Sequence, residues 1–236
     1  MQASAENTGT ITINNDSLID TVEKDSKSIN VFSRDGDINI NLDVNSKIIG
    51  GGGEKGTAID MISAAHHRDQ NNEKSASQIL NNKGVISASN DRTIAAHRSR
   101  ASGGETIINN DGIINGFVDL SSTKHLNTST IDSDKNKYKD IASNGDVKFN
   151  NNGIWNVKDG NGLSSSGDVG TVINTIGTKD KAGLITNTGT IQNVDSAINS
   201  AVLENANVIN SRIIDLGKNT ADTTLTINGD YHGENG

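Results

Sequence analysis

One short unit recurs along this sequence: a glycine that follows Asn or Asp, with a β-branched or large apolar residue at the next positions. Residues 7–11, 82–86, 110–114 and 187–191 are examples. From Gly9 to Gly145 the corner glycines are 20 to 33 residues apart, which is the length of one supersecondary unit. Because Asn and Gly accept positive φ angles, each unit predicts a tight turn followed by a short strand.

Apolar and polar residues alternate after these corners. The alternating apolar sets are Ile38, Ile40, Leu42 and Val44, then Val118 and Leu120, Val147 and Phe149, and Leu225 and Ile227. A period of two places one set of side chains inward and the other in water. Each run is too short for a self-sufficient sheet, so successive coils must stack to bury a column of Ile and Val.

The composition supports stacked strands. The chain has 33 Asn, 25 Gly and 29 Ile against 10 Leu, and it has no Pro. Scarce Leu argues against helices, whereas Asn amides can form ladders between coils at inward-facing corners. Absence of Pro fits strands that have a neighbour on both sides. We therefore expect an all-β fold, a right-handed parallel β-helix (β-solenoid) of roughly seven to nine coils with a few loop insertions.

Two antiparallel sandwich domains are the alternative fold, but they would need longer strands and more aromatic residues than the 3% present. We expect residues 1–236 to form a single β-helix. Residues 65–77, 121–140 and 159–168 lack the alternation and are predicted to leave the rod as loops. Binding surfaces tend to form where such loops emerge, although an inserted loop can equally be inert.

Charge and hydropathy exclude several classes. The net charge of −8 argues against a general nucleic-acid binder. No run of 18 apolar residues predicts a membrane-spanning helix, and the first 20 residues lack the pattern of a signal peptide. The strand pattern has already begun at Thr8, which suggests an excised fragment. Without Cys there is no disulfide, thiolate metal site or cysteine nucleophile.

Three segments, together with the Asn-x-Gly-x-Ile corners, carry a resemblance to a known family. They are GGGGEKGTAID at residues 50–60, IINNDGIING at 107–116 and TLTINGDY at 224–231. This pattern resembles the passenger domains of monomeric (type V) autotransporters, the β-helical adhesins of Gram-negative bacteria. The resemblance implies export through the outer membrane, display at the cell surface, and a longer parent anchored by a C-terminal outer-membrane barrel. Residues 223–236 would then begin the autochaperone region.

The resemblance leads us to expect a passenger fragment that mediates adhesion or cell–cell cohesion, without catalysis or a cofactor. Its expected partners are a host-cell receptor or glycan, the same passenger on a neighbouring cell, or an antibody, and not nucleic acid. Two alternatives stay open. One is a polysaccharide-active β-helix, either a lyase or a tailspike-like hydrolase, and the other is a structural spacer that carries a distal adhesive tip.

Motifs for catalysis or metal binding are weak. A carboxylate pair can perform acid–base chemistry on a sugar, and Asp35 with Asp37, or Asp132 with Asp134, has a suitable spacing. However, Asp-Gly-Asp before a strand is also an ordinary turn. There is no Gly-x-Ser-x-Gly elbow. The adjacent side chains of His66 and His67 would point apart on an extended segment, so we predict no metal site.

One segment departs from the acidic balance of the chain. Residues 55–100 contain seven basic and four acidic residues, and Ala64–His66 and Ala95–His97 are 31 positions apart, near one coil. Stacking would bring them to one edge, with each Arg in a corner or loop. We predict an anion-binding edge there for sulfated glycans, sialic acid or an acidic passenger. Its residues would be His66, His67, Arg68, Arg92, His97, Arg98 and Arg100. The alternative is a solvated edge that binds nothing.

Two aromatic residues complete the prediction. Trp155 alternates with Val157 after a corner, which predicts a place in the apolar column; an exposed position for stacking on a sugar is the alternative. Tyr231 is expected to pack at the C-terminal end of the rod.

Overall fold

The computed structural model describes residues 1–5, 9–33, 36–64, 77–99, 104–120, 146–157, 171–178, 181–193, 200–215 and 224–234. All regular elements within these ranges are β-strands, and they belong to two sheets whose neighbouring strands are parallel. The chain therefore folds as a parallel β-helix, as predicted. The segments predicted as loops lie outside the described residues, apart from Ser77.

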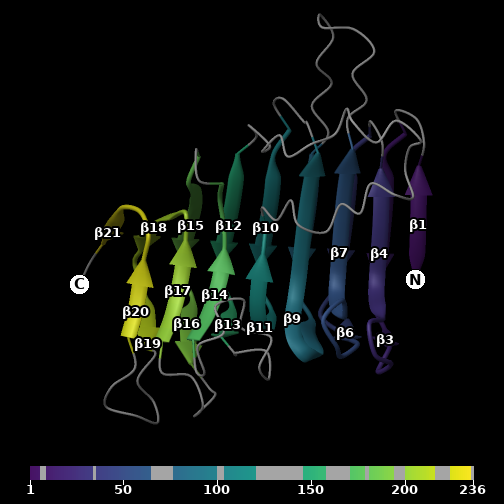
Figure 1. The fold of residues 1–236 in the computed structure, drawn as a ribbon, viewed down its shortest axis with the longest axis horizontal. Helices are drawn as coiled ribbons and strands as arrows, with labels where there is room; N and C mark the ends of the chain where they lie inside the picture. Colours follow the sequence, from purple (N-terminus) through teal and green to yellow (C-terminus); the bar gives the residue numbers. More distant parts are fainter. Residues whose placement is uncertain are drawn as a thin grey trace, which may run out of the picture.

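The smaller sheet forms the first of three strand stacks. Its eight strands lie in chain order along the longest axis of the molecule, with the N-terminal coils at one end and the C-terminal coils at the other (Figure 1). They are β2 (Ile11–Asn15), β5 (Ile38–Leu42), β8 (Gln78–Asn82), β10 (Thr106–Asn110), β12 (Val147–Asn151), β15 (Gly183–Asn187), β18 (Ala206–Asn210) and β21 (Tyr231–Gly233). Eight strands fall within the range of coils expected.

The larger sheet contains the other two stacks. The second stack consists of β3 (Leu18–Asp20), β6 (Lys47–Gly50), the first parts of β9 (Val85–Ser99) and β11 (Ile113–Asp119), β13 (Ile154–Val157), β16 (Thr190–Asn193) and β19 (Ile213–Asp215). The third stack consists of β1 (Gln2–Ala5), β4 (Lys27–Ser33), β7 (Thr57–Ala64), the last parts of β9 and β11, β14 (Thr171–Thr175), β17 (Ser200–Glu204) and β20 (Thr224–Ile227). Each full coil thus contributes one strand to each stack.

Strands β9 and β11 join the second and third stacks because each one bends without ending. At the bend of β9, Asp91 has a φ of 59°. At the bend of β11, Gly116 has a φ of 141°, and a Cβ atom there would lie 1.9 Å from the carbonyl oxygen of Asp91. Only glycine satisfies both the backbone angle and the close approach of the two coils.

The recurring corner glycines have a different role from the one predicted. Among the described residues, the glycines with positive φ are Gly53, Gly116 and Gly229, and the corners after the first stack are not among them. Instead, a Cβ atom on Gly112 would lie 2.2 Å from the carbonyl oxygen of Gly84, and one on Gly153 would lie 2.1 Å from that of Gly112. These glycines let each corner rest directly on the backbone of the coil before it.

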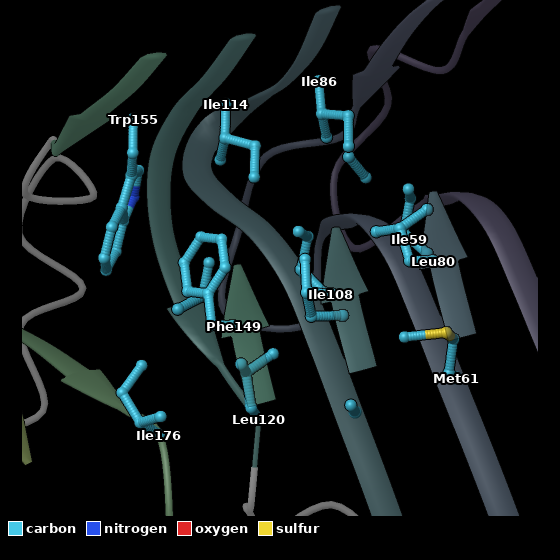
Figure 2. Packing of buried hydrophobic residues seen from close by; sticks show 14 of the residues in the cluster. Ile59, Met61, Leu80, Ile86, Ile108, Ile114, Leu120, Phe149, Trp155 and Ile176 are labelled. Atoms are coloured by element: carbon cyan, nitrogen blue, oxygen red, sulfur yellow. The ribbon is translucent and has the colours of Figure 1, made fainter. Parts of the chain in front are cut away.

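The interior is filled by columns of equivalent side chains. In the first stack, the strand register aligns Ile40, Leu80, Ile108, Phe149 and Ile185, all of which are buried. A second column contains Ile48, Ile86, Ile114, Trp155 and Ile191. Figure 2 shows the middle of the two columns, with Leu80, Ile108 and Phe149 on one side of the core and Ile86, Ile114 and Trp155 on the other.

The largest buried side chains meet at one level of the core. The ring centroids of Phe149 and Trp155 are 4.8 Å apart, and Nε1 of Trp155 donates to the carbonyl oxygen of Gly116 at 2.9 Å. Trp155 is therefore a core residue, as predicted. Tyr231 packs in the last strand of the first stack but is largely exposed, and Val44 is exposed rather than inward because it follows the end of β5.

A ladder of buried amides runs along the inner side of the first stack. Each side-chain Nδ2 donates to the Oδ1 of the next coil at 2.7–2.8 Å, through Asn82, Asn110, Asn151, Asn187 and Asn210. The Nδ2 of Asn110 also donates to the carbonyl oxygen of Ile154 at 3.2 Å, and Asn151 and Asn187 do the same at their own corners. The inward Asn ladder predicted from composition is confirmed.

We expect Asn110→Ala to lower the free energy of unfolding by about 2–4 kcal/mol, because buried partners on both neighbouring coils lose a hydrogen bond. Asn109→Ala is the matched control. Its side chain lies on the outer side of the same strand, where water replaces the lost bonds, so we expect a cost below about 1 kcal/mol. Urea unfolding followed by circular dichroism measures both. Equal costs would show that burial of the ladder contributes nothing.

Candidate functional site

A buried charged cluster lies on the outer side of the third stack. Asp60 sits between the inward residues Ile59 and Met61 of β7, so its side chain points away from the core, yet it is only 3% exposed. Its Oδ2 pairs with Nζ of Lys27 on β4, and its Oδ1 lies 3.4 Å from Nε2 of His97 on β9. One carboxylate thus links three neighbouring coils.

The two neighbours of this carboxyl group, Lys27 and His97, determine its protonation. Burial by itself would raise the pKa of Asp60, because it disfavours the charged form. The close approach of His97 and the charge and hydrogen bond of Lys27 outweigh burial and lower the pKa to about 2. Asp60 is therefore a carboxylate at any pH above that value.

A second pair stabilises the bend of β9. Nη2 of Arg92 lies 3.5 Å from Oδ2 of Asp119 on β11. The Oδ1 of Asn90 accepts from the backbone N–H of Arg92, while its Nδ2 donates to the carbonyl oxygens of Gly53 and Gly56. The carbonyl oxygen of Arg92 accepts from the hydroxyl of Thr57 at 3.0 Å. Arg92 is therefore held inside a network that fixes the path of the backbone between two stacks.

These positions correct the predicted basic edge. Arg92 is predicted in a corner or loop and His97 on the same exposed edge, but both lie within a strand and are 7% and 1% exposed. The backbone of Arg98 also belongs to β9, where it pairs with Ser63. The expected stacking of Ala64 on Ala95 is wrong, because Ala64 pairs with Ser99 and Ala95 pairs with Asp60. Along β7 and β9 the aligned residues are therefore 35 positions apart and not 31.

The remaining residues of that edge are His66, His67, Arg68 and Arg100, and they lie outside the described residues. Their proposed role in anion binding stays a prediction, as does that of Arg98. Asp35, Asp132 and Asp134 also lie outside the described residues, so the structure does not test the acid–base pairs considered for them. Asp37 has a local role, because its Oδ1 accepts from the backbone N–H of Ser77 at 2.8 Å at the start of the next coil. Within the described ranges, no three His, Asp or Glu side chains are grouped as metal ligands.

A different surface has the regular geometry of a binding site. On the outer side of the first stack, each Asn side chain donates to the amide oxygen of the coil before it at 2.8 Å. The members of this outer amide row are Asn14, Asn41, Asn81, Asn109 and Asn150. All are at least partly exposed. Interlocked amides of this kind present polar groups at a fixed spacing with little freedom to move.

A companion row lies beside the outer amide row, two residues earlier on each strand. It contains Asn39, Ile79, Ile107, Lys148 and Leu184, all half-buried. The Nζ of Lys148 pairs with Glu105 at 2.9 Å, and the carboxylate of Glu105 raises the pKa of that amine. The charge in this row is therefore compensated, and the centre of the face is apolar.

Sequence reasoning did not find this outer face. The available signal is the Asn-Asn pair that ends four of the first-stack strands, at residues 14–15, 81–82, 109–110 and 150–151. Since successive residues of a strand point to opposite sides, the first Asn of each pair joins the outer amide row and the second points the other way. In three pairs the second Asn (Asn82, Asn110 or Asn151) belongs to the inner ladder, whereas Asn15 donates to Oγ of Ser46. The high Asn content alone predicts an inner ladder, and only the Asn-Asn dipeptides at the strand ends indicate a second row on the outer side.

Comparisons with known proteins gave no match: no family description, no curated protein and no solved structure is similar to this chain. In the part of the chain that the structure describes, no helix is long and apolar enough to cross a membrane.

The charged cluster predicts a specific acid sensitivity. The pKa of Asp60 is lowered from 3.8 to about 2 on folding, so its contribution to stability is present above pH 4 and is lost as pH falls from 4 to 2. We expect this to amount to roughly 2 kcal/mol. Asp60→Asn removes the titrating group, so its free energy of unfolding should fall less over the same range. Parallel loss in both proteins, measured by urea unfolding at pH 2 to 6, would contradict the assignment.

Proposed function

We propose that this chain is a surface-displayed passenger fragment of an autotransporter adhesin, which mediates attachment or cell–cell cohesion without catalysis. The proposal rests on the resemblance carried by residues 50–60, 107–116 and 224–231 and on a parallel β-helix that presents an outer face. The observation that carries most weight is the outer amide row. It places exposed hydrogen-bonding groups along five successive coils while leaving the core intact.

The alternatives receive less support. His97 and Asp60 form an acid–base pair, but they are almost fully buried, so a substrate has no access to them. Arg92 and His97 act between strands and are not available to an anionic ligand. A polysaccharide-active enzyme would therefore need residues outside this cluster, and adhesion through Arg92 and His97 is disfavoured.

The test is to display the full chain on a non-adhesive Gram-negative host by fusion to an outer-membrane anchor. Cells with the chain should attach to epithelial cells, or aggregate with one another, severalfold more than cells with the anchor alone. Ile40→Asp is a control for the folded rod, because a buried unpaired carboxylate cannot be accommodated in the column. This variant should abolish the gain.

Surface display must be confirmed with an antibody against an added epitope tag. If the displayed chain increases neither attachment nor aggregation, the adhesive function is wrong and the spacer function is favoured. Release of reducing ends from a polysaccharide by the purified chain would instead support the enzymatic alternative.

A further inference from the structure

The inner and outer amides use their hydrogen-bonding groups differently. In the inner ladder, Nδ2 of Asn110 donates both to the next amide and to a backbone carbonyl oxygen. In the outer amide row, Nδ2 of Asn109 donates only to the amide of Asn81, and its Oδ1 accepts from Asn150. Among the described residues, the second N–H and the second lone pair of each central outer amide have no protein partner. Both are available at the surface.

The face formed by these groups is neutral. The outer amide row carries no formal charge, and Lys148 in the companion row is paired with Glu105. Among the described side chains of the two rows, a strongly anionic ligand finds no uncompensated cation. Hydroxyl groups suit it better, because each hydroxyl both donates and accepts a hydrogen bond, as each free amide edge does.

Ile79 and Ile107 lie next to the amides of Asn81 and Asn109 on adjacent strands. Their half-exposed side chains form an apolar strip parallel to the polar row. A pyranose ring has the same division, with C–H groups on its faces and hydroxyl groups at its edges. A sugar lying over the strip therefore brings its hydroxyl groups to the amide row.

The shape of the face favours a linear ligand. Strands β5, β8 and β10 each contribute two outward side chains, whereas the amide row continues from β2 to β12. Neighbouring strands are about 4.8 Å apart, which is close to the length of one sugar residue in an extended chain. A straight polymer therefore meets an equivalent amide at each coil, and the interlocked amides lose little freedom on binding.

We propose that the outer amide row, with Ile79 and Ile107 beside it, is a binding site for a neutral, extended, β-1,4-linked polysaccharide that lies along the axis of the β-helix. This inference rests on the proposed adhesive function and names its partner class as a glycan. The contacts on β8 and β10 form the centre of the site, and those on β5 and β12 extend it.

The experiment measures binding of cellohexaose and chitohexaose to the purified full chain by isothermal titration calorimetry. At least one hexasaccharide should bind, with the same affinity at low and at physiological salt because no ion pair is formed. Asn109→Ala should weaken binding about fivefold, and Asn81→Ala with Asn109→Ala about twentyfold, because each substitution removes a donor and an acceptor.

A matched control comes from the second stack. Asn156 also belongs to an outer row of amides, between Asn115 and Gln192, but it lies around the corner from the proposed site. Asn156→Ala should leave the affinity unchanged. Ile107→Ser tests the apolar strip without touching an amide and should weaken binding severalfold. Thermal unfolding of each variant shows whether the rod remains intact.

Several outcomes overturn the proposal. They are a lack of binding by both hexasaccharides, tighter binding of heparin at low salt, or equal losses in the Asn156 and Asn109 variants. Concentration-dependent dimers that disappear in the Asn81 and Asn109 double variant, without hexasaccharide binding, would assign the face to a second copy of the chain. The display assay is independent of these results, since a displayed chain that attaches to cells without binding either sugar retains the adhesive function and loses only this site.

Discussion

Hydrogen bonds between equivalent groups on successive coils hold this structure together. Each coil has three short strands, and none of them has enough residues to stabilise a sheet alone. Parallel pairing in a constant register places Asn over Asn and Ile over Ile. The buried amide ladder depends on that register, because a shift of one residue would turn every ladder amide outward and every outer amide inward. The ladder therefore stabilises the fold and selects its register.

The fold class could be predicted from the sequence because the same constraint is repeated many times. Alternation at Ile38, Ile40 and Leu42 correctly gave the inward set of one strand, and other coils repeat the pattern. Coil boundaries were harder to predict. Gly36 precedes a first-stack strand, whereas Gly84 and Gly112 follow one. The corner glycines therefore belong to different corners of the coil, which is why the spacing between successive corner glycines varies from 20 to 33 residues.

The candidate site could be predicted less well. The sequence around Arg92 and His97 has the charges of an exposed edge, and a linear sequence does not show which outward residues become buried. Their ionic partners, Asp119 and Asp60, come from other coils and are brought close only by the register of the third stack. The outer amide row could have been predicted, because the two residues of an Asn-Asn pair at the end of a strand point to opposite sides, so one of them must face outward.

The two amide rows of the first stack also run in opposite directions. In the inner ladder, Asn82 donates toward Asn110 and the C-terminal end, whereas in the outer row Asn109 donates toward Asn81 and the N-terminal end. The side-chain dipoles of the two rows therefore oppose each other where the rows lie side by side, from β8 to β12. Within a row, rotation of one amide would break the bonds on both of its sides, so the amides of a row must reverse together or not at all. The inner ladder has one polarity, because the Nδ2 groups of Asn110, Asn151 and Asn187 also donate to backbone carbonyl oxygens, which a reversed amide would face with its oxygen. The outer amide row has no such bond among the described residues, so it can adopt either polarity, and an oriented ligand bound at one end would favour one polarity along the row.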